Sequence, residues 1–290
     1  MSFLNQLQNI DVTTLDDMTD VKVGGESRGL LPTGTAYVRP CMYIEYGSHV
    51  QTFNGQPKPA TPIFKLGFRI VGGGGLNIEG KPEKYVLEEG KFPLITTFDT
   101  ALGFFEKSKS IQYFNALNRV GNKATHFVQK IAEQCIYALP IGVKKNKQGK
   151  DVQDIDFTNL QVALNQETFE QRTGDPTLSD EHIQVFLWDT PTIEMWDSIF
   201  IEGEFPAQKD DSGKITKPAR SRNFHQEKCL SALNFEGSPL QLLLQEEGKS
   251  YTIPELPTTP DVPEEAPSEP AAAVTPPPTD GAVLTPPDLD

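Results

Sequence analysis

Residues 35–71 hold two stretches in which apolar and polar side chains alternate, joined by a polar loop over residues 51–62. Because successive side chains of a strand point to opposite faces, each stretch predicts a β-strand with two distinct faces. The predicted core faces comprise Ala36, Val38, Met42 and Ile44 in the first strand, and Phe64, Leu66, Phe68 and Ile70 in the second.

The opposite faces of the same two strands combine aromatic rings with cations. A single-stranded nucleic acid needs rings on which its bases can stack and cations that neutralise its phosphates. The pattern therefore predicts a nucleic-acid-binding sheet face that contains Tyr37, Arg39, Tyr43, Lys65 and Arg69. The alternative interpretation is a sheet whose second face packs against another layer of the protein.

Residues 99–139 change to helical spacing. Apolar positions predict one helix over residues 123–139, which ends before Pro140, and another around residues 104–117. The four glycines at positions 72–75 are followed by neither the Gly-Lys-Ser/Thr of a phosphate-binding loop nor a clear dinucleotide fingerprint. They predict a flexible turn or a bulge.

Strand patterns return over residues 183–188 and 195–205, and Asn223 is placed to cap a short helix over residues 224–233. The order of elements predicts an α+β, mainly β fold, with an OB-like barrel core and an inserted helical segment at about 99–139. Other α+β folds fit the same order.

The chain divides into an N-terminal arm (residues 1–34), a nucleic-acid-binding body (residues 35–251) and a C-terminal tail (residues 252–290). From Pro254 onward there are 11 prolines and 8 acidic residues, with no Lys, Arg or His. This composition lacks the apolar groups that build a core, so we expect a disordered acidic tail. Without it, the net charge falls in magnitude from −14 to −6.

An acidic body argues against a nucleic-acid role unless its cations are clustered. The window from Lys107 to Lys150 contains nine Lys and Arg residues and one acidic residue. A second basic loop covers residues 208–222. A run of charge is commonly just a solvated face. The predicted phosphate contacts in these two windows are Lys107, Lys109, Arg119, Lys123, Lys144, Lys145, Lys147, Lys150, Lys214, Lys217, Arg220 and Arg222.

Other functional classes find little support. The three cysteines lie far apart, which argues against a disulfide framework and for a reducing, cytoplasmic compartment. The N-terminus lacks the pattern of a signal peptide, and no apolar run has the length of a membrane span. The histidines lack metal-ligand spacing, and no catalytic constellation has supporting context, so we expect no enzyme, metal or cofactor.

Aromatic–cationic strands, basic loops and an acidic tail together resemble the organisation of phage-type single-stranded DNA-binding proteins. The segments MWDSIFIEG (195–203) and SRNFHQEKCLSALNFEGSPL (221–240) are similar to those of such phage proteins. The resemblance covers most of the chain without a diagnostic motif. Bacterial proteins of this type end in an aromatic residue, whereas the last apolar residue here is Leu289.

The resemblance implies a protein that coats and protects single strands during DNA replication, recombination or repair in the cytoplasm of a host cell. Its tail would compete with DNA for the basic groove and recruit replication or recombination proteins, and a homo-oligomer is left open. The expected partner contacts are Asp288, Leu289 and Asp290. The alternatives are a viral structural or assembly protein without nucleic-acid binding and, less favoured, an enzyme.

Overall fold

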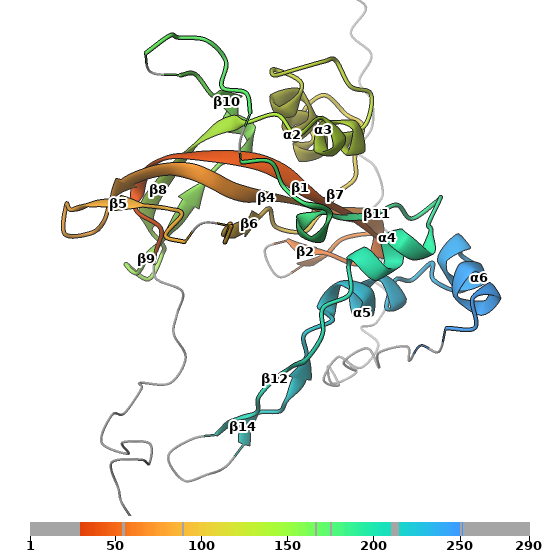
Figure 1. Ribbon diagram of the computed structural model, residues 1–290. Coiled ribbons are helices and arrows are strands. Elements are labelled where there is room, and N and C mark those ends of the chain that lie inside the picture. The colour runs from red at the N-terminus through yellow and green to blue at the C-terminus, as the bar shows by residue number, and fades with distance from the viewer. Residues whose placement is uncertain are drawn as a thin grey trace, which may run out of the picture. The chain divides into compact units, whose positions relative to one another are not determined.

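Two long antiparallel strands organise the part of the chain that the structure describes. This computed structural model describes residues 30–53, 56–88, 90–165, 167–174, 176–209, 215–249 and 251. Strands β1 (Thr33–His49) and β4 (Thr61–Leu76) pair along almost their whole length and cross the centre of the molecule in Figure 1. Both predicted central strands are therefore confirmed. The predicted C-terminal tail and most of the N-terminal arm lie outside the described residues.

The remaining strands of the main sheet flank this pair. The order is β10 (Gln161–Val162), β8 (Tyr137–Lys145), β1, β4 and β5 (Pro82–Lys84). Strand β9 (Asp151–Ile155) pairs with β8, and β11 (Gln184–Phe186) pairs in parallel with β1. Strands β6 (Leu94–Thr96) and β7 (Thr100–Ala101) pair with β4. The mainly β class is confirmed, but this sheet is open within the described residues, so the closed barrel is not.

A β-bulge in β1 changes which side chains share a face. Pro40 pairs with Phe68 and Met42 with Gly67, which leaves Cys41 without a partner across the strands. One extra residue reverses the alternation beyond it. Tyr43 therefore joins Val38 on the same face, whereas Cys41 and Met42 pack on the other. The predicted grouping of Tyr43 with Tyr37 and Arg39 on one face is wrong for this reason, as is that of Met42 and Ile44 with Val38 on the other.

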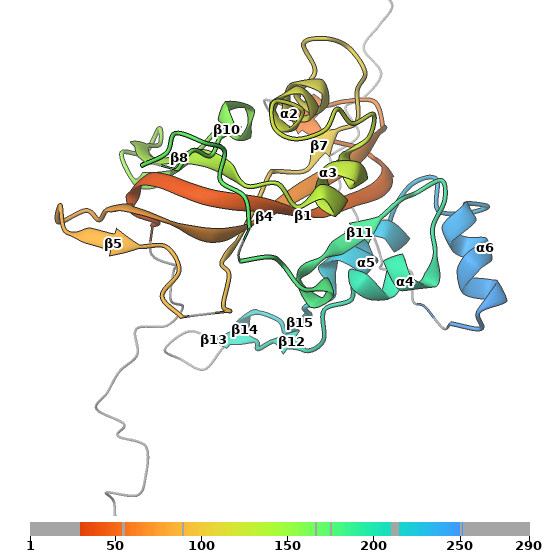
Figure 2. The same ribbon diagram turned by 45° about the horizontal axis from the view of Figure 1, so that its top comes forward.

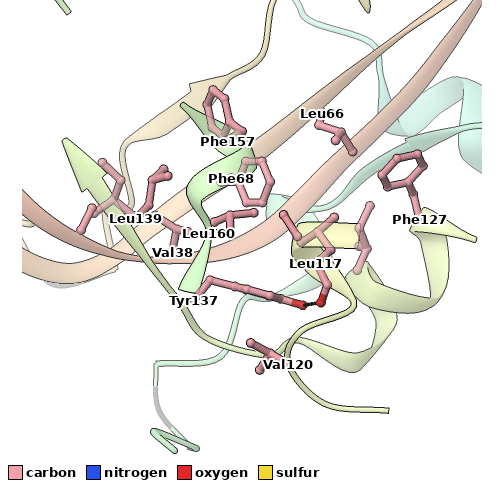
Figure 3. Packing of buried hydrophobic residues seen from close by; sticks show 14 of the residues in the cluster. Val38, Leu66, Phe68, Leu117, Val120, Phe127, Tyr137, Leu139, Phe157 and Leu160 are labelled. Carbon is pink, nitrogen blue, oxygen red and sulfur yellow. Dashed lines mark hydrogen bonds between the residues drawn. The ribbon is translucent and has the colours of Figure 1, made fainter. Parts of the chain in front are cut away.

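One face of the sheet is covered by helices α2 (Lys109–Leu117) and α3 (Phe127–Glu133), as Figures 1 and 2 both show. Phe68 stacks on Phe157 of the short 3-10 helix η2 (Phe157–Asn159), with 5.2 Å between ring centroids. Figure 3 shows the Tyr137 hydroxyl donating to the Leu117 carbonyl oxygen at 2.9 Å, which fixes α2 to β8. The sheet face that carries Val38 is thus a buried core.

The opposite face packs on helices α4 (Ile193–Ser198), α5 (Phe224–Leu230) and α6 (Pro239–Glu246). Trp188, Trp196 and Phe235 are buried in this second core with Ile44 and Tyr46 of β1. Both faces of the central strands are therefore covered by protein, as the alternative interpretation of the sequence proposed. The remaining elements are the 3-10 helix η3 (Asp180–His182) and a short hairpin of β2 (Thr52–Phe53) and β3 (Gln56–Pro57).

Two predicted elements have a different secondary structure. The helix expected over residues 123–139 ends at Glu133, because Gln134 adopts a left-handed backbone conformation (φ 56°), and β8 follows. The strand expected over residues 195–205 begins instead as helix α4, whose start is capped by the Thr192 side chain accepting from the Met195 N–H. Helix α5 is confirmed, and the strand expected over residues 183–188 forms β11.

The glycine run belongs to β4 and is not a turn. Gly73 has a φ of 90°, and a Cβ there would lie 2.2 Å from the Thr35 carbonyl oxygen. A Cβ on Gly75 would lie equally close to the Thr33 carbonyl oxygen. Glycine is required because the backbones of β1 and β4 approach too closely for any side chain.

Candidate nucleic-acid interface

The aromatic–cationic strand face predicted from the sequence is mostly buried. Tyr43 is 0% exposed and stacks on Phe127, with 5.0 Å between ring centroids, while its hydroxyl donates to Glu45 Oε1 at 2.7 Å. Burial, with the nearby Glu45 carboxylate, raises the pKa of Tyr43. Arg39 is 3% exposed, and its guanidinium donates to the Pro176 carbonyl oxygen at 2.8 Å and to that of Gly174. Neither side chain forms part of an exposed sheet surface.

The other three members of that predicted face are half-buried and engaged in contacts within the protein. The guanidinium of Arg172 lies 4.4 Å from the centroid of the Tyr37 ring. Lys65 forms an ion pair with Asp99 at 3.0 Å, and Arg69 donates to the Phe92 carbonyl oxygen at 2.9 Å. These cations position loops and strands, so they contribute little free charge to a ligand.

The basic window between residues 107 and 150 is less positive in the structure than in the sequence. Strands β8 and β9 form a hairpin in this window, where Lys144 pairs with Asp154 at 2.7 Å and Lys145 with Asp151 at 2.9 Å. Lys130 is buried and bonds to carbonyl oxygens and to Glu133. Acidic residues of β9 therefore lie next to the exposed lysines of β8 in this hairpin. Its exposed predicted contacts are Lys144, Lys145, Lys147 and Lys150.

A second group of predicted cations surrounds helix α2 and the loop that follows it. Lys107, Lys109, Arg119 and Lys123 are all at least partly exposed. Arg119 also donates to the Leu160 carbonyl oxygen at 3.0 Å, and Lys123 donates to that of Asn118 at 3.0 Å. Lys107 and Lys109 lie at the start of α2, next to the segment that precedes this helix.

That preceding segment carries three exposed phenylalanines. The apolar spacing of the sequence had predicted a helix that included two of them, Phe104 and Phe105. Phe98 is 92% exposed, Phe104 81% and Phe105 83%. They lie between β6 and β7 and between β7 and α2, shortly before Lys107. A contiguous exposed apolar patch is a common mark of an interaction site, so this segment is a candidate for one. With the adjacent lysines they form the stacking segment, residues 98–109.

Local hydrogen bonds hold the stacking segment outside the helix. The Ser108 side chain caps α2 by accepting from the Ile111 N–H, and it donates to the carbonyl oxygens of Gly103 and Phe105. The Ser110 hydroxyl accepts from the Gly103 N–H at 3.1 Å. Because the helix begins only after Ser108, the two preceding rings miss the core. Two serines ahead of an apolar run were the sequence signal for this boundary.

A basic hairpin forms a third candidate surface. Strand β12 (Glu204–Phe205) pairs with β15 (Arg220–Ser221), and β13 (Gln208–Lys209) pairs with β14 (Ile215–Lys217). The guanidinium groups of Arg220 and Arg222 lie 4.9 and 5.2 Å from the Phe205 ring centroid. Lys217 and Arg220 are exposed, and so is Arg222, which directly follows β15. The hairpin projects from α5 in Figure 1. Lys214 lies outside the described residues.

Other kinds of site are not seen in the part of the chain that the structure describes. No group of three or more His, Cys, Asp or Glu side chains there is arranged to hold a metal ion. None of the described helices has the length and apolar character needed to cross a membrane. The expected tail contacts Asp288, Leu289 and Asp290 lie beyond the described residues. The chain matches no known family model, no curated protein and no solved structure.

Proposed function

We propose that this protein binds single-stranded DNA and coats it during DNA replication, recombination or repair. The observation that carries the proposal is the stacking segment, where three exposed phenylalanine rings precede the exposed Lys107 and Lys109 in the chain. Stacking on exposed rings and neutralisation of phosphates are the two contributions that single-strand binding without sequence preference requires. In a duplex the base faces are covered by their neighbours, so the same surface favours single strands.

The basic hairpin supports the proposal independently. Lys217, Arg220 and Arg222 lie on or beside its strands, and Arg220 and Arg222 are close to the Phe205 ring, which repeats the combination of cation and aromatic surface. The OB-like identity of the body remains a prediction within this proposal. Its support is the antiparallel β1–β4 pair with its bulge, because bulges bend a sheet and a barrel requires bent strands.

A binding measurement tests the proposal. Fluorescence anisotropy of labelled oligo-dT and of a duplex of equal length should show tighter binding to the single strand. The affinity should fall steeply between about 50 and 200 mM salt, because bound cations release counterions from the phosphates. Equal affinity for duplex and single strand, or no binding at the lower salt, contradicts the proposal.

A second candidate function is a viral structural or assembly protein. The same exposed rings at Phe98, Phe104 and Phe105 favour it, because apolar surface of this kind also serves contacts between proteins. Sedimentation of the full chain without DNA distinguishes the two. Large assemblies that form without DNA and bind no oligonucleotide favour the structural role.

A further inference from the structure

A pocket of about 310 Å³ opens behind the stacking segment, between β1, α2 and α3. Its volume falls at the lower end of the range for small-molecule sites. Four of its twelve lining residues are Phe or Tyr and one is His, and Phe104 of the stacking segment is among them. The lining residues that matter are Tyr43, Glu45, Phe104, Phe114, His126 and Phe127.

The aromatic wall is held rigidly. Tyr43 stacks on Phe127, and Phe114 meets Phe127 edge to face with 5.3 Å between centroids. His126 meets Tyr43 edge to face at 5.2 Å. Tyr43 and Phe127 belong to the core, whereas Phe104 is 81% exposed. The pocket thus has a fixed aromatic floor and one exposed ring that can cover an occupant.

A carboxylate with a fixed orientation supplies the polar chemistry. Glu45 Oε2 accepts from the Trp188 backbone N–H at 2.8 Å, and Oε1 accepts from the Tyr43 hydroxyl at 2.7 Å. Oε1 also lies 3.9 Å from His126 Nε2. An ionised carboxylate offers about four acceptor positions, so acceptor capacity is left for a further donor. Asp189 adds a second carboxylate to the lining.

We propose that this pocket receives one unstacked nucleobase that carries an exocyclic amino group, an inference that rests on the proposed function. Flat aromatic walls suit a base, and carboxylate oxygens accept from the amino N–H of cytosine, as they do in the grooves of DNA. Thymine lacks an amino group, and its one ring N–H lies between two carbonyl oxygens, which the carboxylates repel. The nearby Lys107 and Lys109 attract phosphates and disfavour a cationic occupant.

The test compares three single strands of equal length: oligo-dC, oligo-dT and a fully abasic strand. The wild-type protein should bind oligo-dC more tightly than oligo-dT, and both more tightly than the abasic strand. Phe104→Ala should weaken oligo-dC binding roughly 5- to 150-fold, the range for removing one ring on which a base stacks, and leave abasic binding unchanged. Phe169→Ala is the matched control, since that ring is also exposed but lies outside the pocket.

Glu45→Gln tests the specificity. The Trp188 N–H should keep the amide oxygen where Oε2 now lies, so the amide NH₂ replaces the acceptor Oε1 beside the pocket. The preference should then move from oligo-dC toward oligo-dT. A melting curve confirms that each variant is folded.

Two results overturn the pocket while leaving single-strand binding intact. One is an equal affinity of the wild-type protein for oligo-dC and oligo-dT. The other is an equal effect of Phe104→Ala on oligo-dC and abasic strands. That result is also expected if the pocket binds a cation and not a base. A wild-type protein that binds none of the three strands overturns the proposed function itself.

Discussion

The Tyr46 hydroxyl lies 2.7 Å from Nδ1 of His225, and the two rings stack with an interplanar angle of 13°. This pair joins β1 to α5 in the second core. Burial, with the positive charges of Lys65 and Lys228, lowers the pKa of His225 to about 4. The imidazole is therefore neutral in the folded protein at physiological pH.

The first prediction follows from this shifted pKa. An unfolded chain takes up a proton on His225 near its ordinary pKa of 6.5, whereas the folded protein does so only near 4. Stability is therefore full above the unfolded pKa and is lost as the pH falls toward the folded one. The free energy of unfolding should decrease by about 3 kcal/mol over this window, as measured by urea denaturation.

His225→Gln is the variant for this measurement, because the amide can still bond to Tyr46 but does not titrate. Its free energy of unfolding should be lower at neutral pH and should change much less between pH 6.5 and 4. An unchanged pH slope in the variant assigns the acid sensitivity to other groups.

The second prediction concerns Asp99, which lies between two lysines. Lys65 is 3.0 Å away and Lys228 forms a second ion pair, which ties the segment before β7 to β4 and α5. Burial alone would raise the pKa of Asp99, but the bonds and charges of Lys228 and Lys65 lower it on balance. Asp99→Asn should reduce the free energy of unfolding by about 1–2 kcal/mol.

The pH dependence separates this effect from that of His225. A carboxylate with a lowered folded pKa stabilises above its unfolded pKa and loses the effect only as the pH falls through the folded one. The difference between wild type and Asp99→Asn should therefore be constant from about pH 5 to 8. A difference that varies across that range contradicts this assignment. The matched control is Asp197→Asn, whose ion pair with Lys249 is more exposed.

The third prediction contrasts a buried with an exposed aromatic residue. Tyr43→Ala should reduce the free energy of unfolding by about 3–5 kcal/mol, because it opens a cavity in the first core. Phe105→Ala should leave stability nearly unchanged and reduce single-strand affinity by about 1–3 kcal/mol. Thermal melting and anisotropy on the same samples check both. A Phe105→Ala protein with wild-type affinity removes this ring from the interface.

The fourth prediction concerns the basic hairpin. Replacing Lys217, Arg220 and Arg222 by Ala should weaken single-strand binding and make it less sensitive to salt. The slope of log K against log salt should fall by about 0.7 for each phosphate that the variant no longer neutralises. The control variant replaces Lys81, Lys91 and Lys249, which form exposed ion pairs elsewhere. Equal slopes for the two triple variants reduce the hairpin to a general contribution of charge.

The fifth prediction concerns the acidic tail. Deleting residues 255–290 removes eight acidic groups tethered to a protein that we propose binds a polyanion. The deletion should strengthen single-strand binding, more at low salt than at high salt, because screening weakens the competition of the tail. Anisotropy across a salt series measures this. Identical affinities of both proteins at every salt concentration leave the tail as a spacer or a docking peptide.

The sequence predicted the paired strands β1 and β4 because their alternation is long and regular. It could not predict which face each ring occupies, because one bulge at Cys41 reverses the order and leaves no mark in a period of two. The helix expected over residues 123–139 was too long for a related reason. Tyr137, Leu139 and Ile141 also alternate, so a buried strand was hidden in a helical window.

The sequence predicted which residue types form the candidate interface better than it predicted where those residues lie. The window of nine cations stopped at Lys150, directly before Asp151 and Asp154, which pair with its lysines. Phe104 and Phe105 were assigned to a helix whose start at Ser108 excludes them. Exposure depends on where a helix begins, and an error of a few residues there moves a ring from the core to the surface.

The parallel pairing of β11 with β1 constrains how the chain reaches its native state. Met42 pairs with Gln184, so this contact closes a loop of about 140 residues, whereas β1 meets β4 across one short connection. During synthesis the edge of β1 next to Met42 must therefore wait, unpaired, until most of the body has left the ribosome. An unpaired strand edge can pair with the wrong strand. Because β1 folds early with β4, this edge stays exposed until β11 arrives.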